Sequence, residues 1–113
     1  MSNQDWWKGL PVAVTVTAAD GTIIDMNARA LETFAADGGA ALIGQSVFAC
    51  HPEPARSTTR ELYARQAPNH YTIRKNGQKK AIHQLPWFEN GVFAGFVEIS
   101  IPIPRELPHF DRD

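Results

Sequence analysis

The stretch from His70 to Ile101, HYTIRKNGQKKAIHQLPWFENGVFAGFVEISI, decides the fold. It contains two Asn-Gly pairs, Asn76–Gly77 and Asn90–Gly91, and each pair lies between runs rich in β-branched and aromatic residues. Asn-Gly is typical of a two-residue hairpin turn, because both central residues of that turn need positive φ. The stretch therefore predicts three antiparallel strands joined by two tight hairpins.

The two turns also predict which side chains share a face of the sheet. Two-residue turns would place Tyr71 opposite Ile82 and Gln84 opposite Val97, and successive side chains point to opposite faces. The face expected to meet helices is almost entirely apolar and carries Tyr71, Ile73, Ile82, Gln84, Phe88, Phe93, Val97, Ile99 and Ile101. The other face is mixed, should meet solvent, the N-terminal segment or another subunit, and carries His70, Thr72, Arg74, Lys79, Ala81, His83, Leu85, Trp87, Phe96, Glu98 and Ser100.

Two shorter strands and several helices are predicted before this stretch. The segments PVAVTVTAAD and TIIDM flank a hairpin turn at Asp20–Gly21. Asn27 is the expected N-cap of a first helix, which Gly38–Gly39 would end. A longer helix should begin near Pro52, because proline is tolerated in the first helical turn, and end before Pro68. The predicted order is two strands, helices, then three strands.

The composition limits the class of protein. With 113 residues, 43% of them hydrophobic and 20% charged, the chain is long enough for one soluble domain. The formal net charge of −1 offers no basic face of the kind that nucleic acid requires. A single cysteine excludes an internal disulfide and fits a reducing compartment. Neither a signal-peptide pattern nor an apolar run of about 20 residues is present, so we expect a cytoplasmic protein.

Taken in order, ADGTIIDMNARALETF, LIGQSVF, the helix from Pro52 and NGVFAGFVEIS resemble the PAS (sensory box) family. The resemblance covers about residues 11–103. It implies an α+β fold, with a PAS-like five-stranded antiparallel sheet and short helices on one face enclosing a small cavity. Residues 1–10 would then form an N-terminal cap segment, residues 11–103 the PAS domain and residues 104–113 a C-terminal tail.

The resemblance also implies a function. Such domains sense ligands or cofactors, or pair with partners, so we expect a sensory module that binds a small ligand in its cavity and signals through protein–protein contacts. The alternative is a ligand-free module for dimerisation or docking. We expect a homodimer, a separate signalling protein is a further candidate partner, and no nucleic acid or membrane is expected to bind. The sequence shows no Ser-His-Asp order, phosphate loop or close carboxylate pair, so no enzyme is expected.

The expected cavity wall combines the predicted inner sheet face with the helices: Phe34, Phe48, Cys50, His51, Leu62, Tyr71, Gln84 and Val97. Gln84 stands out as an amide on an otherwise apolar face. A buried amide needs hydrogen-bond partners. Gln84 therefore either orients a ligand or bonds to a backbone group or to Tyr71, and the sequence leaves both interpretations open.

Cys50 and His51 have two interpretations. They could be adjacent ligands of a metal or haem, although zinc normally takes three or four protein ligands. Pro52 and Pro54 favour the alternative, a helix start beside the pocket, with Cys50 buried and His51 either capping the helix or facing the pocket mouth. Family members that form a flavin–cysteine adduct carry an Asn-Cys-Arg-Phe-Leu-Gln type motif, which ACHPEP does not match. We therefore do not expect flavin, and haem or a metal stays open.

Two further sets of residues lie on the predicted mixed face. In the predicted register His70, His83 and Glu98 stand side by side across three strands. Two imidazoles and a carboxylate could bind zinc or form a proton-sensitive cluster, but a polar surface patch is the favoured interpretation. An apolar set on the same face and at the N-terminus predicts an interface, covered by the N-terminal turn and by a second subunit. Its members are Trp6, Trp7, Leu85, Trp87 and Phe96.

Overall fold

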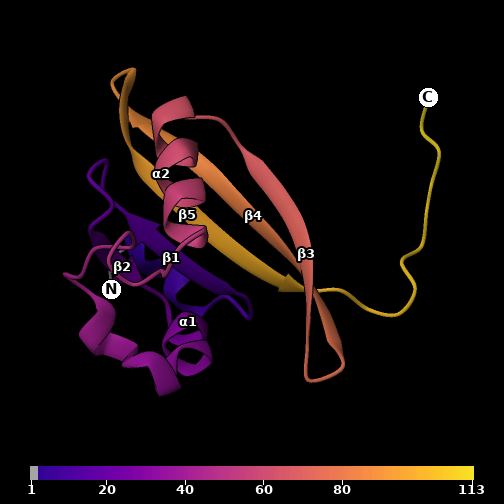
Figure 1. The fold of residues 1–113 in the computed structure, drawn as a ribbon. Coiled ribbons are helices and arrows are strands. Elements are labelled where there is room, and N and C mark those ends of the chain that lie inside the picture. The colour runs from indigo at the N-terminus through magenta and orange to yellow at the C-terminus, as the bar shows by residue number, and fades with distance from the viewer. Residues whose placement is uncertain (1–2) are drawn as a thin grey trace.

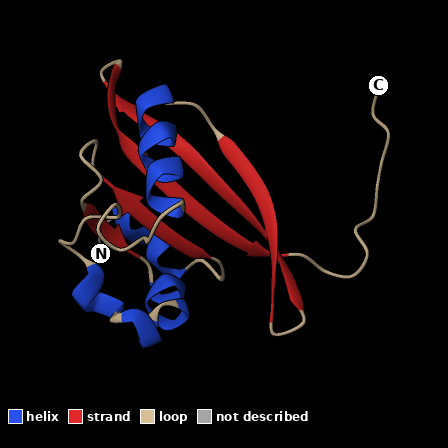
Figure 2. Ribbon diagram, viewed as in Figure 1, coloured by secondary structure: helices blue, strands red, loops and turns tan. Residues whose placement is uncertain are grey.

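The computed structural model describes residues 3–113 and contains one five-stranded antiparallel sheet with helices packed on one face (Figures 1 and 2). The strand order is β2-β1-β5-β4-β3. In chain order, with η for a 3-10 helix, the elements are η1 (Asn3–Gly9), β1 (Ala13–Thr17), β2 (Ile23–Met26), α1 (Ala28–Thr33), η2 (Ala35–Asp37), η3 (Gly39–Leu42), α2 (Ala55–Arg65), β3 (Asn69–Lys75), β4 (Gln78–Glu89) and β5 (Val92–Pro102). After β5 the chain extends away from the sheet (Figure 1). The predicted sheet is confirmed, and helices form in both predicted places, but α1 ends at Thr33 instead of at Gly38–Gly39, and α2 begins at Ala55, three residues after Pro52.

Asn27 connects the start of α1 to β1 and to the N-terminal turn through hydrogen bonds of its side chain. Its side chain is fully buried, and its Oδ1 accepts hydrogen bonds from the backbone N–H groups of Ala30 and Val14, both at 2.9 Å. Its Nδ2 donates to the carbonyl oxygens of Val12 at 2.8 Å and Trp7 at 3.2 Å. Because a buried amide must satisfy both its oxygen and its nitrogen, Asn27 fixes three segments at one point. The predicted N-cap is confirmed.

Both Asn-Gly hairpins form as predicted. Asn76 and Asn90 have φ angles of 51° and 52°, and the glycines that follow them have φ angles of 78° and 79°. Positive φ at both central residues is the signature of the type I′ turn. From Asn76 the pairing of β3 with β4 continues without interruption, so that Tyr71 stands opposite Ile82 and His70 opposite His83. The predicted register of this hairpin is confirmed.

The pairing of β4 with β5 shifts by one residue close to its turn. Phe88 pairs with Phe93, as predicted, but the preceding Trp87 pairs with Gly95. Gly95 has a φ angle of 143°, and a Cβ atom added to it would lie 1.9 Å from the carbonyl oxygen of Thr17 on β1. Only glycine tolerates both the backbone angle and the close approach. A β-bulge therefore forms where β1 and β5 come together.

The bulge exchanges the two faces of β5 relative to the predicted register. Gln84 pairs with Glu98 instead of Val97, and Phe96 packs against α2. Phe96 is 4% exposed, whereas Val97 is half-buried. The predictions that Val97 and Ile99 face the helices, and that Phe96 and Glu98 face outward, are wrong. The physical reason is that a one-residue slip moves every later side chain to the opposite face.

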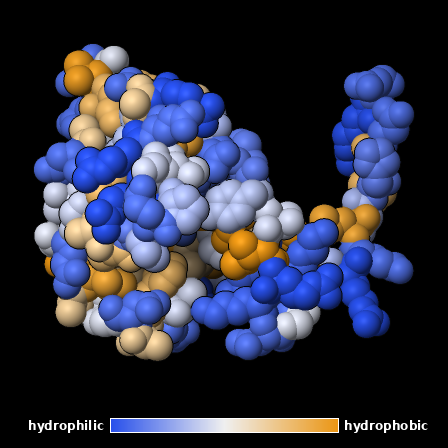
Figure 3. Space-filling view, viewed as in Figure 1, coloured by the Kyte–Doolittle hydropathy of each residue, from blue (hydrophilic) through white to orange (hydrophobic). Residues whose placement is uncertain are grey.

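Two apolar clusters lie between the helices and the sheet. The first joins β1, β2 and α1 and contains Ala13, Ile23, Met26 and Ala30. The second joins α2 to β5 and contains Leu62, Tyr63 and Phe96. The outward side of α2 carries exposed arginines and is hydrophilic in the space-filling view (Figure 3). Members of both clusters also line the space between them.

Candidate functional site

A cavity of 520 Å³ lies between the sheet and the helices. Four strands contribute to its wall, together with α2 and the segments from the end of α1 to the start of α2. The lining residues are Thr15, Thr17, Ile23, Met26, Phe34, Asp37, Leu42, Gln45, Val47, Cys50, His51, Thr59, Leu62, Tyr63, Gln84, Phe96 and Glu98. A cavity of this size whose wall combines apolar side chains with hydrogen-bonding groups has the character of a small-molecule site.

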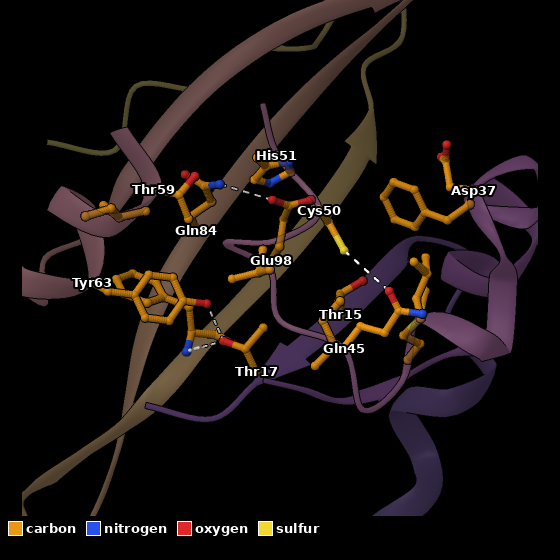
Figure 4. Close-up of a pocket in the computed structure, with 17 residues that line it drawn as sticks. Thr15, Thr17, Asp37, Gln45, Cys50, His51, Thr59, Tyr63, Gln84 and Glu98 are labelled. Carbon is orange, nitrogen blue, oxygen red and sulfur yellow. Dashed lines mark hydrogen bonds between the residues drawn. The ribbon is translucent and has the colours of Figure 1, made fainter. Parts of the chain in front are cut away.

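Gln84 and Glu98 form a fixed polar row across the sheet. Asn69 Nδ2 donates to Gln84 Oε1 at 2.8 Å, and this bond turns the amide so that Gln84 Nε2 donates to Glu98 Oε2 at 3.1 Å. The pairing of β3, β4 and β5 aligns the three residues. Figure 4 shows the Gln84–Glu98 bond on the side of the cavity where Thr59 and His51 are drawn. The row presents an amide and a carboxylate at defined positions.

Tyr63 closes another part of the wall and ties α2 to the sheet. Its hydroxyl forms a hydrogen bond with the hydroxyl of Thr17, which also accepts from the backbone N–H of Phe96 at 3.2 Å (Figure 4). Burial raises the pKa of the Tyr63 phenol, and the bond to Thr17 offsets part of that rise. The side chain is therefore a neutral hydroxyl at physiological pH. These bonds connect α2 with β1 and with β5 just after the bulge.

The start of α2 is capped by Glu53. Pro54 is the N-cap residue and has no side-chain bond, but the Glu53 carboxylate accepts from the backbone N–H of Ser57 at 2.9 Å and from its hydroxyl. A carboxylate is favourable here because the N-terminus of a helix carries partial positive charge. His51 supplies no cap in the structure; its carbonyl oxygen accepts from Arg56 Nε at 3.1 Å. The interpretation of His51 as a helix cap is wrong, and its side chain lines the cavity instead.

Cys50 and His51 are the residues of the wall with thiol and imidazole groups. Cys50 is exposed, not buried as expected, and its Sγ lies 4.0 Å from Gln45 Oε1. In the cavity wall, the thiol and the imidazole are the side chains that a soft metal or a haem iron would take as ligands. Within residues 3–113 the structure contains no group of three or more His, Cys, Asp or Glu side chains arranged to hold a metal ion. The two side chains alone supply fewer ligands than a structural zinc takes.

Comparison with protein-family models decides the family. The model described as the PAS fold matches residues 7–103, which is most of the chain. This chain belongs to the PAS family. The resemblance noted in the sequence is confirmed, and family membership supports a signalling module. In the described part of this PAS domain, no helix is both long enough and apolar enough to cross a membrane.

Solved structures show the same fold at low sequence identity. The PAS domain of BvgS from Bordetella pertussis is 22% identical, with a TM-score of 0.62, over 87% of this chain and 81% of that one. A C-terminal domain from Streptococcus mutans is 18% identical, with a TM-score of 0.68, over 84% and 78%. The Aer2 receptor from Vibrio cholerae, described as a dual PAS-heme oxygen sensor, is 13% identical, with a TM-score of 0.63, over 87% and 99%. A comparison with curated proteins finds no match.

The structure brings together five of the eight predicted pocket residues. Phe34, Cys50, His51, Leu62 and Gln84 line the cavity. Phe48 lies outside the wall, where its ring packs edge-on to Tyr63 with ring centroids 5.0 Å apart. Tyr71 is 44% exposed near the sheet edge, and Val97 is on the opposite face because of the bulge. The amide of Gln84 bonds to Asn69 and Glu98 side chains, so neither expected partner, a backbone group or Tyr71, is used.

The predicted row of His70, His83 and Glu98 does not form. The two imidazoles are neighbours, with His70 Nδ1 and His83 Nδ1 joined by a hydrogen bond of 2.9 Å. Glu98, however, lies on the other face of the sheet and lines the cavity. The bulge therefore removes the carboxylate from the set, which contradicts the alternative of a zinc site at these three residues.

The predicted interface set is divided between surface and core. Four members are exposed or half-buried: Trp6, Trp7, Leu85 and Trp87. Phe96 does not belong to the set, because its ring packs on Tyr63 with ring centroids 4.6 Å apart. Val97 takes its place on the outer face, opposite Leu85. The interface itself stays a prediction.

Sequence reasoning did not include Tyr63, Thr17 or Glu98 in the cavity wall. Tyr63 follows Thr59 by four residues, so helical spacing already places both on one face of α2. The signal for Glu98 is Gly95, since a glycine inside a strand marks a bulge or a close backbone approach. A bulge at Gly95 moves Glu98 to the helix side.

Proposed function

We propose that this PAS domain is a sensory module that binds a small ligand in the cavity and transmits the signal through protein–protein contacts. The cavity of about 520 Å³, whose wall combines apolar side chains with hydrogen-bonding groups, is the observation that carries the proposal. Gln84, Glu98, His51 and Thr59 supply hydrogen-bonding groups, and Leu62 belongs to the apolar part of the wall. Such a ligand would be held by burial and oriented by the polar row.

Two of the strands that line the cavity, β4 and β5, supply the route of the signal in this proposal. Gln84 and Glu98 face the cavity, and their chain neighbours Leu85 and Val97 pair with each other on the outer face. A ligand that displaces the Gln84–Glu98 pair would therefore move the Leu85–Val97 pair, one residue away along each strand. An interface on the outer face would sense this displacement directly.

A second copy of the chain is the proposed partner on the outer face. Leu85, Trp87, Val97 and Ile99 are half-buried and apolar, and apolar sets of this kind mark interfaces. Their presence also favours the second candidate function, a ligand-free dimerisation module. Analytical ultracentrifugation of the wild type and of Leu85→Lys shows whether the protein is a dimer, as both candidate functions require, or a monomer. A dimer that Leu85→Lys dissociates supports the outer face, with Val92→Lys as the control because Val92 is 68% exposed at the hairpin end.

Filling the cavity tests ligand binding. Thr59 is half-buried and lines the cavity, whereas the adjacent Thr58 is exposed and does not. Thr59→Trp should therefore abolish binding, and Thr58→Trp should preserve it. Native mass spectrometry would follow any co-purified molecule, and saturation-transfer NMR would follow the neutral probe 2-phenylethanol. Equal binding to both variants, or no binding to the wild type, would contradict the proposal and leave the ligand-free module.

A further inference from the structure

The charged side chains of the cavity wall have one sign. Asp37, which is exposed, and Glu98, which is half-buried, line the cavity, and neither lysine nor arginine is among the described residues of the wall. His51 is the one described wall side chain with a basic group. At neutral pH the wall therefore carries two negative charges, which raise the local concentration of cations and repel anions.

Glu98 is the carboxylate best placed to meet a ligand. It is half-buried at the cavity wall, and one of its oxygens, Oε2, accepts from Gln84 Nε2. Within residues 3–113 the ion pairs are Lys8–Asp25 and Arg29–Glu32, so Glu98 has no basic partner there. A partly desolvated carboxylate without a cation is unfavourable, and a bound cation would relieve that cost.

Gln84 gives the carboxylate a fixed neighbour. The bond from Asn69 Nδ2 holds Gln84 Oε1, so the amide nitrogen of Gln84 stays directed at Glu98. The wall also has an apolar part, which includes Leu62 and Phe96. A ligand that matches this wall needs a donor-rich positive group at one end and an apolar body at the other.

We infer that the cavity takes a small organic cation, with an ammonium or amidinium group beside Glu98 and an apolar or aromatic body against Leu62 and Phe96. This inference rests on the proposed function, because it names the class of ligand for the same cavity. It excludes carboxylates and phosphates as the ligand class, since either would bring a third negative charge into a wall without Lys or Arg.

Three probes of one size and three charges test the inference at pH 7.5: 2-phenylethylamine, 2-phenylethanol and phenylacetate. Titration calorimetry, or NMR shifts where binding is weak, should show that the amine binds most tightly, the alcohol less tightly and the carboxylate least tightly. The amine should bind about tenfold more tightly than the alcohol, because bonds between charged groups are roughly twice as strong as neutral ones. Added salt should lower the affinity for the amine and leave the affinity for the alcohol unchanged.

Glu98→Gln is the matching variant, since it removes the charge and keeps the shape. It should lower the affinity for the amine about tenfold, to the level of the affinity for the alcohol. The affinity for the alcohol should change by less than about twofold. Glu89→Gln is the control, because Glu89 is an exposed carboxylate at the end of β4, and it should change neither of the two affinities. Circular dichroism checks that each variant is folded, and Asp37→Asn provides a second variant of the wall.

The outcomes separate the inference from the proposed function. If the alcohol binds as tightly as the amine, or the carboxylate binds best, the cation preference is overturned while ligand binding in the cavity stands. If none of the three probes binds, both are overturned. If Glu98→Gln does not fold, the order of the three probes in the wild type and in Asp37→Asn still decides the inference.

Discussion

The two hairpins of the sheet begin alike and end differently. Asn76–Gly77 and Asn90–Gly91 adopt the same positive φ angles, and each aligns the residues next to it as a two-residue turn should. The first alignment continues to the end of β3. The second is shifted by one residue at Gly95, where β5 passes close to Thr17 of β1. A turn therefore fixes a register only as far as the neighbouring strand allows.

This difference decides the chemistry of the cavity. Without the shift, Val97 and Ile99 would point at the helices and the wall would be apolar on β5. With it, Phe96 completes the core beside α2 and Glu98 brings a carboxylate to Gln84. The displaced apolar residues then enlarge the outer face, where an interface is proposed.

The largest expected effect is at the bulge. Gly95→Ala should lower the free energy of unfolding by about 5 kcal/mol or prevent folding, because the new Cβ would lie 1.9 Å from a backbone oxygen. Gly91→Ala is the control: its φ angle is 79° with no atom within 4 Å of the added Cβ, so about 1 kcal/mol is expected. Urea denaturation measures both. Equal losses in the two variants would show that no close approach exists at Gly95.

The next effect compares the two faces of β5 directly. Phe96→Ala should cost about 3–4 kcal/mol, since it empties a buried ring site between Tyr63 and Phe93. Val97→Ala, on the half-buried outer face, should cost about 1 kcal/mol. Denaturant titrations measure the free energy of unfolding of both variants. A larger loss for Val97→Ala than for Phe96→Ala would favour the register without a bulge.

Tyr63 contacts Phe93 and Phe96, on either side of the bulge, and gives a pH-dependent test. Burial raises the pKa of its phenol above the unfolded value of about 10. Its contribution to stability is therefore complete below about pH 10 and is lost as the pH rises through the raised pKa. The test uses Tyr71→Phe as the background, because the pKa of Tyr71 is also raised by desolvation.

In that background the unfolding free energy should fall as the pH rises above about 10, and the further change Tyr63→Phe should flatten this decline. At pH 7 the same change should cost about 1 kcal/mol through the lost bond to Thr17. Denaturant unfolding at each pH provides the measurement. A decline of unchanged slope in the Tyr63→Phe variant would mean that Tyr63 is not the group that titrates.

The smallest effects lie away from both hairpins, at the start of α2. Glu53→Ala should cost about 1 kcal/mol because it removes the observed cap. His51→Ala and Cys50→Ala should each change stability by less than about 0.5 kcal/mol, since neither side chain supplies a cap or a buried core contact. Thermal unfolding of the three variants tests this order. A loss at His51 as large as that at Glu53 would bring back the capping role that the sequence suggested.

The sequence predicts the features that depend on neighbours along the chain. Asn27 as N-cap, both Asn-Gly turns and the β3–β4 register follow from local rules, and the structure contains all of them. The residues predicted to line the cavity from the helical side, such as Phe34 and Leu62, are also in place. These positions depend only on the spacing within one helix or one turn.

The features that the sequence does not predict depend on contacts between distant segments. The bulge at Gly95 lies against the backbone of Thr17, which is 78 positions earlier in the chain and on a different hairpin. The apolar run Val97, Ile99 and Ile101 is also the more attractive candidate for a core face, yet it lies outside. Because the position of Glu98 follows from the bulge, the polar row of the cavity could not be predicted from hydrophobic pattern alone.

The most direct test of the central claim is a nuclear Overhauser experiment on the labelled protein. The claim is that the bulge turns Phe96 and Glu98 toward α2. The account predicts strong cross-peaks between the ring protons of Phe96 and Tyr63, whose ring centroids are 4.6 Å apart, and none between Val97 methyl groups and Tyr63. Cross-peaks from Val97 to Tyr63, with Phe96 showing contacts to the outer residues of β4, would contradict the bulge and the cavity wall built on it.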